Sequence, residues 1–184
     1  MRFFYGLIAI EKTKKINDLK TLYQLYYTVA LNYRRQGQYE KGQEYILNGM
    51  TIAEKNKEID YIIKYNTFLS LNYHDFESYE KGVFYGKKTI KLLDLHKKYT
   101  LEDRRYALNA TAINYDDWNK PDSALFYHYK VVKLAKGVDL LKIDQTYNNI
   151  GNTLLKQKQF STARKWLLKS NNATDFKFAG KTKD

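Results

Sequence analysis

The sequence repeats itself with a step of about 40 residues, and this repetition limits the folds that are open to it. Ala-Leu-Asn-Tyr at 30–33 returns as Ser-Leu-Asn-Tyr at 70–73 and as Ala-Ile-Asn-Tyr at 112–115. Tyr-Glu-Lys-Gly at 39–42 returns unchanged at 79–82. A period of this size is typical of stacked arrays, because one unit is too small to bury its own apolar face. Such arrays usually present a surface to a partner and seldom carry out chemistry.

Within each unit, apolar residues recur every three or four positions, which predicts two helices. In the first unit one such series runs from Leu22 to Tyr33 and a second runs from Tyr39 to Ile52. Gly37 lies between the two series and can adopt the left-handed conformation that ends a helix. Each unit is therefore expected to be a helical hairpin with a short turn.

Small residues recur at two positions where the paired helices are expected to touch. They are Ala30, Ser70, Ala112 and Gly151 in the first helices, and Gly42, Gly82, Ala124 and Ala163 in the second helices. A glycine inside a helix costs about 0.5–1 kcal/mol relative to alanine. Its recurrence at one phase of the pattern indicates that the two backbones approach closely there.

The pattern resembles that of the tetratricopeptide repeat family. The fourth unit carries it most fully, in Tyr147, Ile150, Gly151, Leu154, Phe160 and Ala163. The first unit shows it through Gly37, Tyr39 and Gly42. The resemblance covers nearly the whole chain and implies an all-α superhelix. The period is longer than the family's 34 residues, and longer units of this kind resemble those of bacterial regulatory tetratricopeptide domains.

We therefore expect one all-α solenoid over 1–175, with about four helical hairpins and a leading half-repeat. The half-repeat spans 1–17, the hairpins span about 18–58, 59–99, 100–139 and 140–175, and a frayed basic tail spans 176–184. The half-repeat is either a lone capping helix or a sign that the sequence is a piece of a longer protein. Its apolar first residues favour a piece, because a terminal repeat is expected to be polar outside. Exposed end repeats also make self-association an open alternative.

Composition narrows the function classes. The chain has no cysteine, which excludes disulfides and thiol catalysis, and it has no apolar run long enough to cross a membrane. With no signal segment evident, we expect a cytoplasmic protein. The net charge of +12 invites a nucleic-acid interpretation. However, the excess of lysine over arginine is also typical of an AT-rich genome, and we expect nucleic acid only as a lesser alternative, through the basic C-terminal region.

The resemblance implies a concave groove, lined by the first helix of each hairpin, that holds a peptide or a partner protein. At the positions that match, the groove residues are Tyr27, Arg34, Arg35, Lys64, His74, Asn109, Asp116, Asp117, Asn148, Asn152 and Lys156. Their charge changes from basic to mixed to acidic along the array, which suits a peptide with its own charge pattern better than a uniform polyanion. The asparagine amides offer both donors and an acceptor, as a peptide backbone requires. The alternative is that they are solvated surface amides.

Two narrower sites are disfavoured. The carboxylate clamp of chaperone-binding tetratricopeptide domains is absent, because Tyr27, Leu31 and Phe68 occupy its lysine and asparagine positions. His74, with Asp75 and the acidic pair at 116–117, offers metal-ligating atoms, but a charged groove wall explains these residues better. No motif for a phosphate loop, a zinc protease or a nucleophilic serine occurs. We expect no cofactor, no metal and no enzymatic activity.

Two functional hypotheses follow. The first is an adaptor or scaffold that binds protein or peptide in the groove. The second is the ligand-sensing domain of a bacterial signalling or transcription regulator, in which peptide binding changes the pitch of the superhelix.

Overall fold

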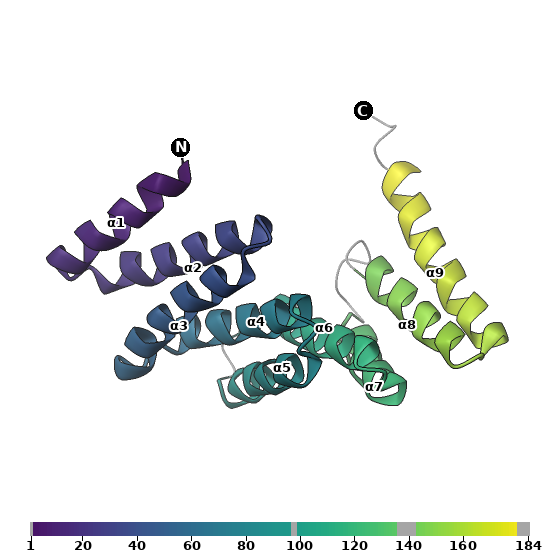
Figure 1. Cartoon of the computed structure of the whole chain (residues 1–184). Coiled ribbons are helices and arrows are strands. Elements are labelled where there is room, and N and C mark those ends of the chain that lie inside the picture. Colours follow the sequence, from purple (N-terminus) through teal and green to yellow (C-terminus); the bar gives the residue numbers. More distant parts are fainter. Residues whose placement is uncertain (1, 97–98, 136–142, 180–184) are drawn as a thin grey trace. The chain divides into compact units, whose positions relative to one another are not determined.

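The computed structural model describes residues 2–96, 99–135 and 143–179, and the side chains of 6–96, 99–135 and 143–171. All regular structure in these residues is α-helical, as the sequence predicted (Figure 1). The helices are α1 (Arg2–Ile16), α2 (Leu19–Arg35), α3 (Tyr39–Lys55), α4 (Ile59–Asp75), α5 (Tyr79–Leu95), α6 (Leu101–Asp117), α7 (Pro121–Leu134), α8 (Asp144–Lys156) and α9 (Phe160–Ala179).

The chain forms two compact units, Met1–Leu95 and His96–Asp184. In the first unit each helix packs against the next along the chain, and α2 also contacts α4. The first helices of successive hairpins, α2 and α4, therefore lie side by side. The helix α1 packs on α2 as α3 packs on α4.

The second unit contains two hairpins, α6–α7 and α8–α9, and α7 also packs against α8. The predicted tail at 176–184 begins inside α9, which is helical to Ala179, and residues 180–184 lie outside the described part of the chain. The predicted boundary between the third and fourth hairpins, at 139–140, also lies outside it.

The small residues that recur in the sequence are buried at the helix crossings. All eight are buried, and five of them have no exposed surface: Ala30, Ser70, Ala112, Ala124 and Ala163. A Cβ added at Gly42 would lie 3.1 Å from the carbonyl oxygen of Ala30. The Ser70 hydroxyl donates to the carbonyl of Gly82 at 2.8 Å. The predicted close approach of the two backbones is therefore confirmed.

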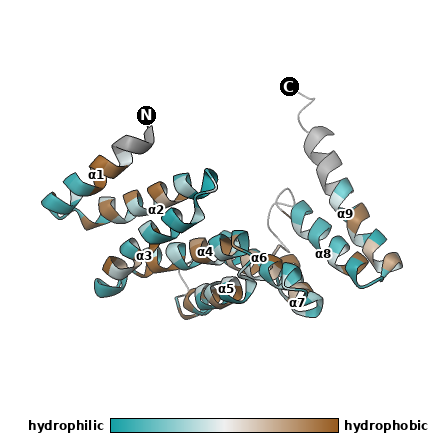
Figure 2. Ribbon diagram, in the orientation of Figure 1, coloured by the Kyte–Doolittle hydropathy of each residue, from teal (hydrophilic) through white to brown (hydrophobic). Residues whose placement is uncertain are grey.

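Tyrosines fill the space beside these crossings in the same way in three hairpins. The ring of a tyrosine in the first helix stacks on a tyrosine twelve residues later in the second helix. The pairs are Tyr33–Tyr45 (5.4 Å between ring centroids), Tyr73–Tyr85 (5.4 Å) and Tyr115–Tyr127 (5.6 Å). Figure 2 shows that hydrophobic and hydrophilic residues are interspersed along the helices. Burial of these rings together with the aliphatic core side chains favours pairing of the helices.

The turns share one backbone geometry. Gly37 has φ +71°, which confirms its predicted left-handed conformation. Its neighbour Gln38 donates its amide to the carbonyl of Tyr33 at 3.0 Å, closing the α2 end with the hydrogen-bond pattern of a Schellman motif. The same hydrogen-bond pattern ends α3, α4, α6 and α8. The left-handed residues there are Lys57, Glu77, Asn119 and Lys158, which have φ between 55° and 60°.

Candidate functional site

The predicted groove residues all lie on the first helices of the hairpins. We call the surface that these residues form in each unit its A-helix face. In the first unit they are Tyr27, Arg34 and Arg35 on α2 and Lys64 and His74 on α4; in the second unit they are Asn109, Asp116 and Asp117 on α6 and Asn148, Asn152 and Lys156 on α8. The face is therefore described separately for each unit.

On the first unit, an ion pair joins the ends of α2 and α4. The Nε and Nη2 atoms of Arg34 lie 2.7 and 2.6 Å from Oδ2 of Asp75. The other carboxylate oxygen of Asp75 lies 3.6 Å from Nδ1 of His74. The Arg34 and Asp75 side chains are 28% and 21% exposed. Arg34 thus neutralises Asp75 within the fold, which leaves Arg35, exposed at the end of α2, to carry positive charge outward.

Aromatic side chains lie in and beneath the middle of this face. The Tyr27 ring packs against Phe68 and Tyr65 of α4, at centroid distances of 6.3 and 6.5 Å. The Tyr65 hydroxyl donates to the carbonyl oxygen of Tyr23 at 2.9 Å, and burial raises the pKa of Tyr65 well above its usual value. The ammonium of Lys64 lies 5.0 Å from the centre of the Tyr61 ring. Tyr27 therefore joins the two helices as well as forming part of the surface.

On the second unit, two hydrogen-bonded contacts join α6 to α8. The Thr146 hydroxyl donates to Oδ1 of Asn109 at 3.4 Å, and the Thr153 hydroxyl donates to Oδ2 of Asp116 at 2.9 Å. Each pair is 37 residues apart in sequence, and the two pairs are separated by seven residues, or about two helical turns, on both helices. Neither threonine was predicted as a site residue from the sequence, although their seven-residue spacing equals that of Asn109 and Asp116.

Lys156 extends the second contact. Its Nζ atom lies 3.2 Å from Oδ1 of Asp116 and 3.6 Å from Oδ1 of Asp117. The Asp116 side chain is 13% exposed, whereas Lys156 is 49% exposed and Asp117 is 45% exposed. Asp116 is thus held inside the fold, and Asp117 and Lys156 present charge at the surface.

Asn148 and Asn152 are exposed on α8, one helical turn apart. Neither side chain forms a hydrogen bond with another described residue of the chain. Of the three asparagines in the predicted site, Asn109 is engaged by Thr146, and these two leave their amide groups directed to solvent. Both amides are therefore available to a peptide backbone.

A buried histidine lies behind the second unit's A-helix face. His128 on α7 has no exposed surface, and its two ring nitrogens have no hydrogen-bond partner among the described residues. Burial lowers the pKa of His128 to about 4, although the negative charge of Asp116 acts in the opposite direction. The imidazole is therefore neutral at pH 7 and behaves as a core side chain.

The residues considered for metal binding are divided between the units, with His74 and Asp75 in the first and Asp116 and Asp117 in the second. Within the described part of the chain, no three histidine or acidic side chains gather as metal ligands would. None of the described helices combines the length and the apolar character needed to cross a bilayer.

The first unit also contains a pocket of about 580 Å³ formed by α3, the end of α4 and the start of α5. Its lining residues are Glu40, Gln43, Glu44, Leu47, Tyr73, Phe76, Ser78 and Lys81. The groove prediction contains none of these residues.

No model of a known protein family and no curated protein matches this sequence. Solved structures do match the fold. BtubC (BKLC) from P. vanneervenii is similar with a TM-score of 0.84 and 16% identity, covering 92% of this chain and 70% of that chain. Kinesin light chain TPR-like repeats from Podosopora anserina match with a TM-score of 0.65 and 11% identity, covering 100% of this chain and 98% of that one.

A Signal Transduction ATPase with Numerous Domains protein with a tetratricopeptide repeat sensor, from Pyrococcus horikoshii, is similar with a TM-score of 0.80 and 16% identity. The match covers 93% of this chain and 26% of that protein, so this chain spans about a quarter of its length. At such identities the likeness concerns the fold. The protein has an all-α fold of helical hairpins of the tetratricopeptide repeat kind.

Proposed function

We propose that this protein binds a protein or peptide segment on its A-helix face, as an adaptor or scaffold, without catalysing a reaction. The observation that carries the proposal is the pair of exposed amides at Asn148 and Asn152, on a helix that hydrogen bonds from Thr146 and Thr153 join to α6. Asn148 and Asn152 both project from α8, so the helix itself fixes the spacing of their backbone positions before a ligand arrives. A preorganised surface loses less conformational entropy on binding than a flexible one.

The chemistry of the second unit's face suits an extended polypeptide. Each asparagine amide can donate to a backbone carbonyl and accept from a backbone N–H. Exposed apolar side chains accompany the amides, with Tyr106 55% exposed and Leu155 40% exposed. Asp117 and Lys156 add one charge of each sign. This combination favours a segment that presents its backbone together with an apolar residue and a charged residue.

Charge distinguishes the two units. The first unit presents Arg35 and Lys64 on its A-helix face. Asp75 lies on the same face, and Arg34 neutralises its charge. On the second unit, two aspartates share one lysine. The first face therefore favours acidic side chains in its ligand and the second favours basic ones.

A pull-down from the native lysate, nuclease-treated and at moderate salt, tests the proposal with three forms of the protein. These are the wild type, Asn148→Ala with Asn152→Ala, and the control Asn171→Ala, which removes an exposed amide from α9. We expect a discrete protein to be retained by the wild type and the control and lost by the double variant. Its binding is then measured with purified components by calorimetry.

Equal retention by all three forms would show that the A-helix face of the second unit is not the binding surface. Retention by the wild type that occurs only without nuclease and at low salt would instead favour binding of nucleic acid through the basic C-terminal region, because phosphate contacts weaken steeply with salt.

A second candidate function is ligand sensing within a larger regulator. The similarity to a structure that contains a tetratricopeptide repeat sensor supports it. Small-angle scattering with and without the captured ligand separates the two functions. A scaffold is expected to keep its radius of gyration, and a sensor is expected to change it.

A further inference from the structure

The pocket on the first unit has a fixed aromatic floor. Tyr73 stacks on Tyr85 with an interplanar angle of 9°, and its hydroxyl oxygen accepts a hydrogen bond from Nε2 of Gln43 at 3.1 Å. Phe76 packs edge-on against Tyr39, at 5.7 Å between ring centroids. Partners from α3 and α5 therefore hold both rings in place, so that the floor exists before any ligand binds.

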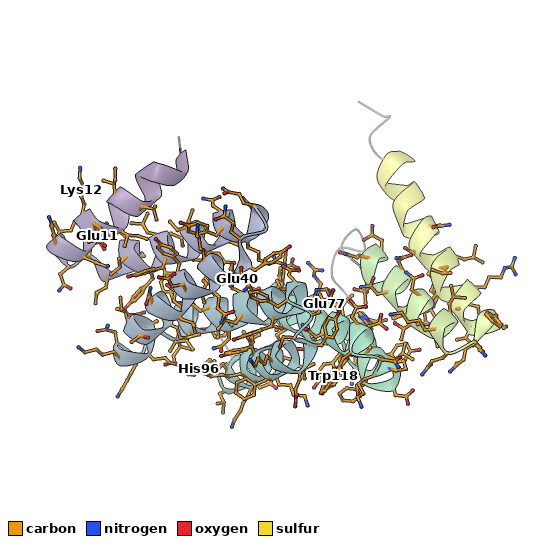
Figure 3. All side chains as sticks on the ribbon, viewed as in Figure 1. Glu11, Lys12, Glu40, Glu77, His96 and Trp118 are labelled. Carbon is orange, nitrogen blue, oxygen red and sulfur yellow. The ribbon has the colours of Figure 1, made fainter. Side chains whose placement is uncertain are left out.

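Charged side chains line the pocket above this floor. Glu40 and Glu44 are exposed and lie one turn apart on α3, where Figure 3 labels Glu40. Lys81 contributes from α5, and its Nζ atom lies 5.5 Å from the centre of the Tyr73 ring. The pocket thus carries two carboxylates and one ammonium, a net charge of about −1 at pH 7 on a protein of net charge +12.

The position of Lys81 indicates which ligand chemistry the floor accepts. The face of a tyrosine ring attracts cations, and here that face already holds an ammonium from the same chain. A guanidinium is a better occupant than an ammonium, because it is planar, stacks on aromatic rings and pairs with carboxylates in a fork geometry. The two glutamates supply the carboxylates that such a group requires.

We propose that this pocket binds an arginine side chain of a partner polypeptide, whose guanidinium takes the place of the Lys81 ammonium over Tyr73 and pairs with Glu40 and Glu44. The pocket volume of about 580 Å³ exceeds that of one side chain and leaves room for neighbouring residues of the segment. Leu47, which is 40% exposed at the pocket, offers an apolar contact for one of them. The site is separate from the A-helix face and does not depend on the function proposed for that face.

NMR titration of the ¹⁵N-labelled full chain tests the assignment. The probe is the peptide acetyl-Gly-Leu-Arg-Gly-amide at low salt, and its control carries citrulline, a neutral isostere, in place of arginine. We expect saturable shifts in the amides of α3 and the α4–α5 turn with the arginine peptide alone. Glu40→Gln with Glu44→Gln is expected to weaken binding at least about fivefold, because two charged contacts are lost.

Two further variants distinguish binding of the peptide in the pocket from general electrostatic attraction between the peptide and the protein. Glu58→Gln with Glu80→Gln changes the net charge equally at exposed glutamates that do not line the pocket, and it is expected to leave binding unchanged. Lys81→Ala removes the competing ammonium and is expected to strengthen binding about twofold or more, as one exposed cation is displaced. Circular dichroism verifies that each variant is folded.

Equal shifts with the citrulline peptide, or weakening of the same size in both glutamate pairs, would overturn the proposal. Weaker binding by Lys81→Ala would also overturn it, because Lys81 would then be a partner of the ligand rather than its competitor. Asn148→Ala with Asn152→Ala serves as the reference for the A-helix face. It is expected to bind the arginine peptide normally, so that failure of one site is distinguishable from failure of the other.

Discussion

Arg34 donates from Nε to Oδ2 of Asp75 at 2.7 Å and so joins the C-terminal ends of α2 and α4. Both side chains are less than one third exposed. Charge-assisted hydrogen bonds of this kind are stronger than exposed ion pairs, and we expect a coupling free energy of about 1 kcal/mol between the two residues. A double-mutant cycle of Arg34→Met and Asp75→Asn, followed by urea unfolding, measures it.

The neighbouring Arg35 is the matched control for this cycle. It is exposed, and Arg35→Met is expected to change the free energy of unfolding by less than about 0.5 kcal/mol. A coupling free energy near zero between Arg34 and Asp75 would mean that solvent screens the pair.

The turns that end the helices predict that two substitutions change the stability of the protein in opposite directions. Gly37 has φ +71°, and a Cβ built on it meets nothing within 4 Å, so Gly37→Ala tests the backbone alone. We expect it to destabilise the protein by about 1 kcal/mol, because left-handed backbone is unfavourable for alanine. Glu77, labelled in Figure 3, has φ +56° at the equivalent position, and Glu77→Gly is expected to stabilise by a similar amount.

Thermal unfolding of both variants checks this pair. Changes of the same sign would show that the left-handed conformation of the turns does not control their stability.

Close packing at Gly49 predicts destabilisation by a substitution that ordinarily favours a helix. An added Cβ would lie 2.7 Å from the Tyr65 hydroxyl oxygen and 3.0 Å from Cβ of Tyr26. Tyr65 cannot move easily, since its hydroxyl donates a hydrogen bond to the carbonyl oxygen of Tyr23. We expect Gly49→Ala to cost about 1–3 kcal/mol despite its gain in helix propensity.

Asn48→Ala, at the adjacent exposed position of α3, is the control for this substitution and is expected to be neutral or stabilising. Urea denaturation compares the two variants. A neutral Gly49→Ala would contradict the tight approach of α3 to Tyr65.

His128 predicts a dependence of stability on pH. Its pKa is about 4 in the folded protein, against an ordinary value of 6.5, so the unfolded chain binds the proton more readily between these values. The stabilising contribution is fully present above pH 6.5 and is lost as the pH falls to about 4. The loss is about 3 kcal/mol in total.

Chemical denaturation of the wild type and His128→Ile at several pH values separates the contribution of His128 to the pH dependence of stability from that of the carboxylates. Isoleucine is the residue at the equivalent position of the first hairpin, Ile46, which is fully buried. The difference in stability between the two proteins is expected to grow as the pH falls. A difference that stays constant from pH 7 to pH 4 would show that His128 is accessible to protons in the folded state.

Local pattern was sufficient to predict the hairpins and their crossings. The spacing of Leu22, Tyr26 and Tyr33 predicts a helix because the helical period is local, and Gly37 marks its end because glycine tolerates positive φ. The small residues at Ala30 and Gly42 predict close backbone contact because larger side chains cannot fit there. The left-handed turns at Lys57 and Glu77 were not predicted, because neither residue type favours positive φ and the surrounding hydrogen bonds impose it.

The helices, the phase of their buried sides and the set of polar residues on the first helices all follow from local sequence pattern. Which of these polar residues remain available depends on how the helices pack. Arg34 and Asp116 bear full charges in the sequence, yet Asp75 and Lys156 neutralise them in the fold, whereas Asn148 and Asn152 stay exposed. Such pairing depends on the register between helices about 40 residues apart, and that register is set by how the small and aromatic side chains pack.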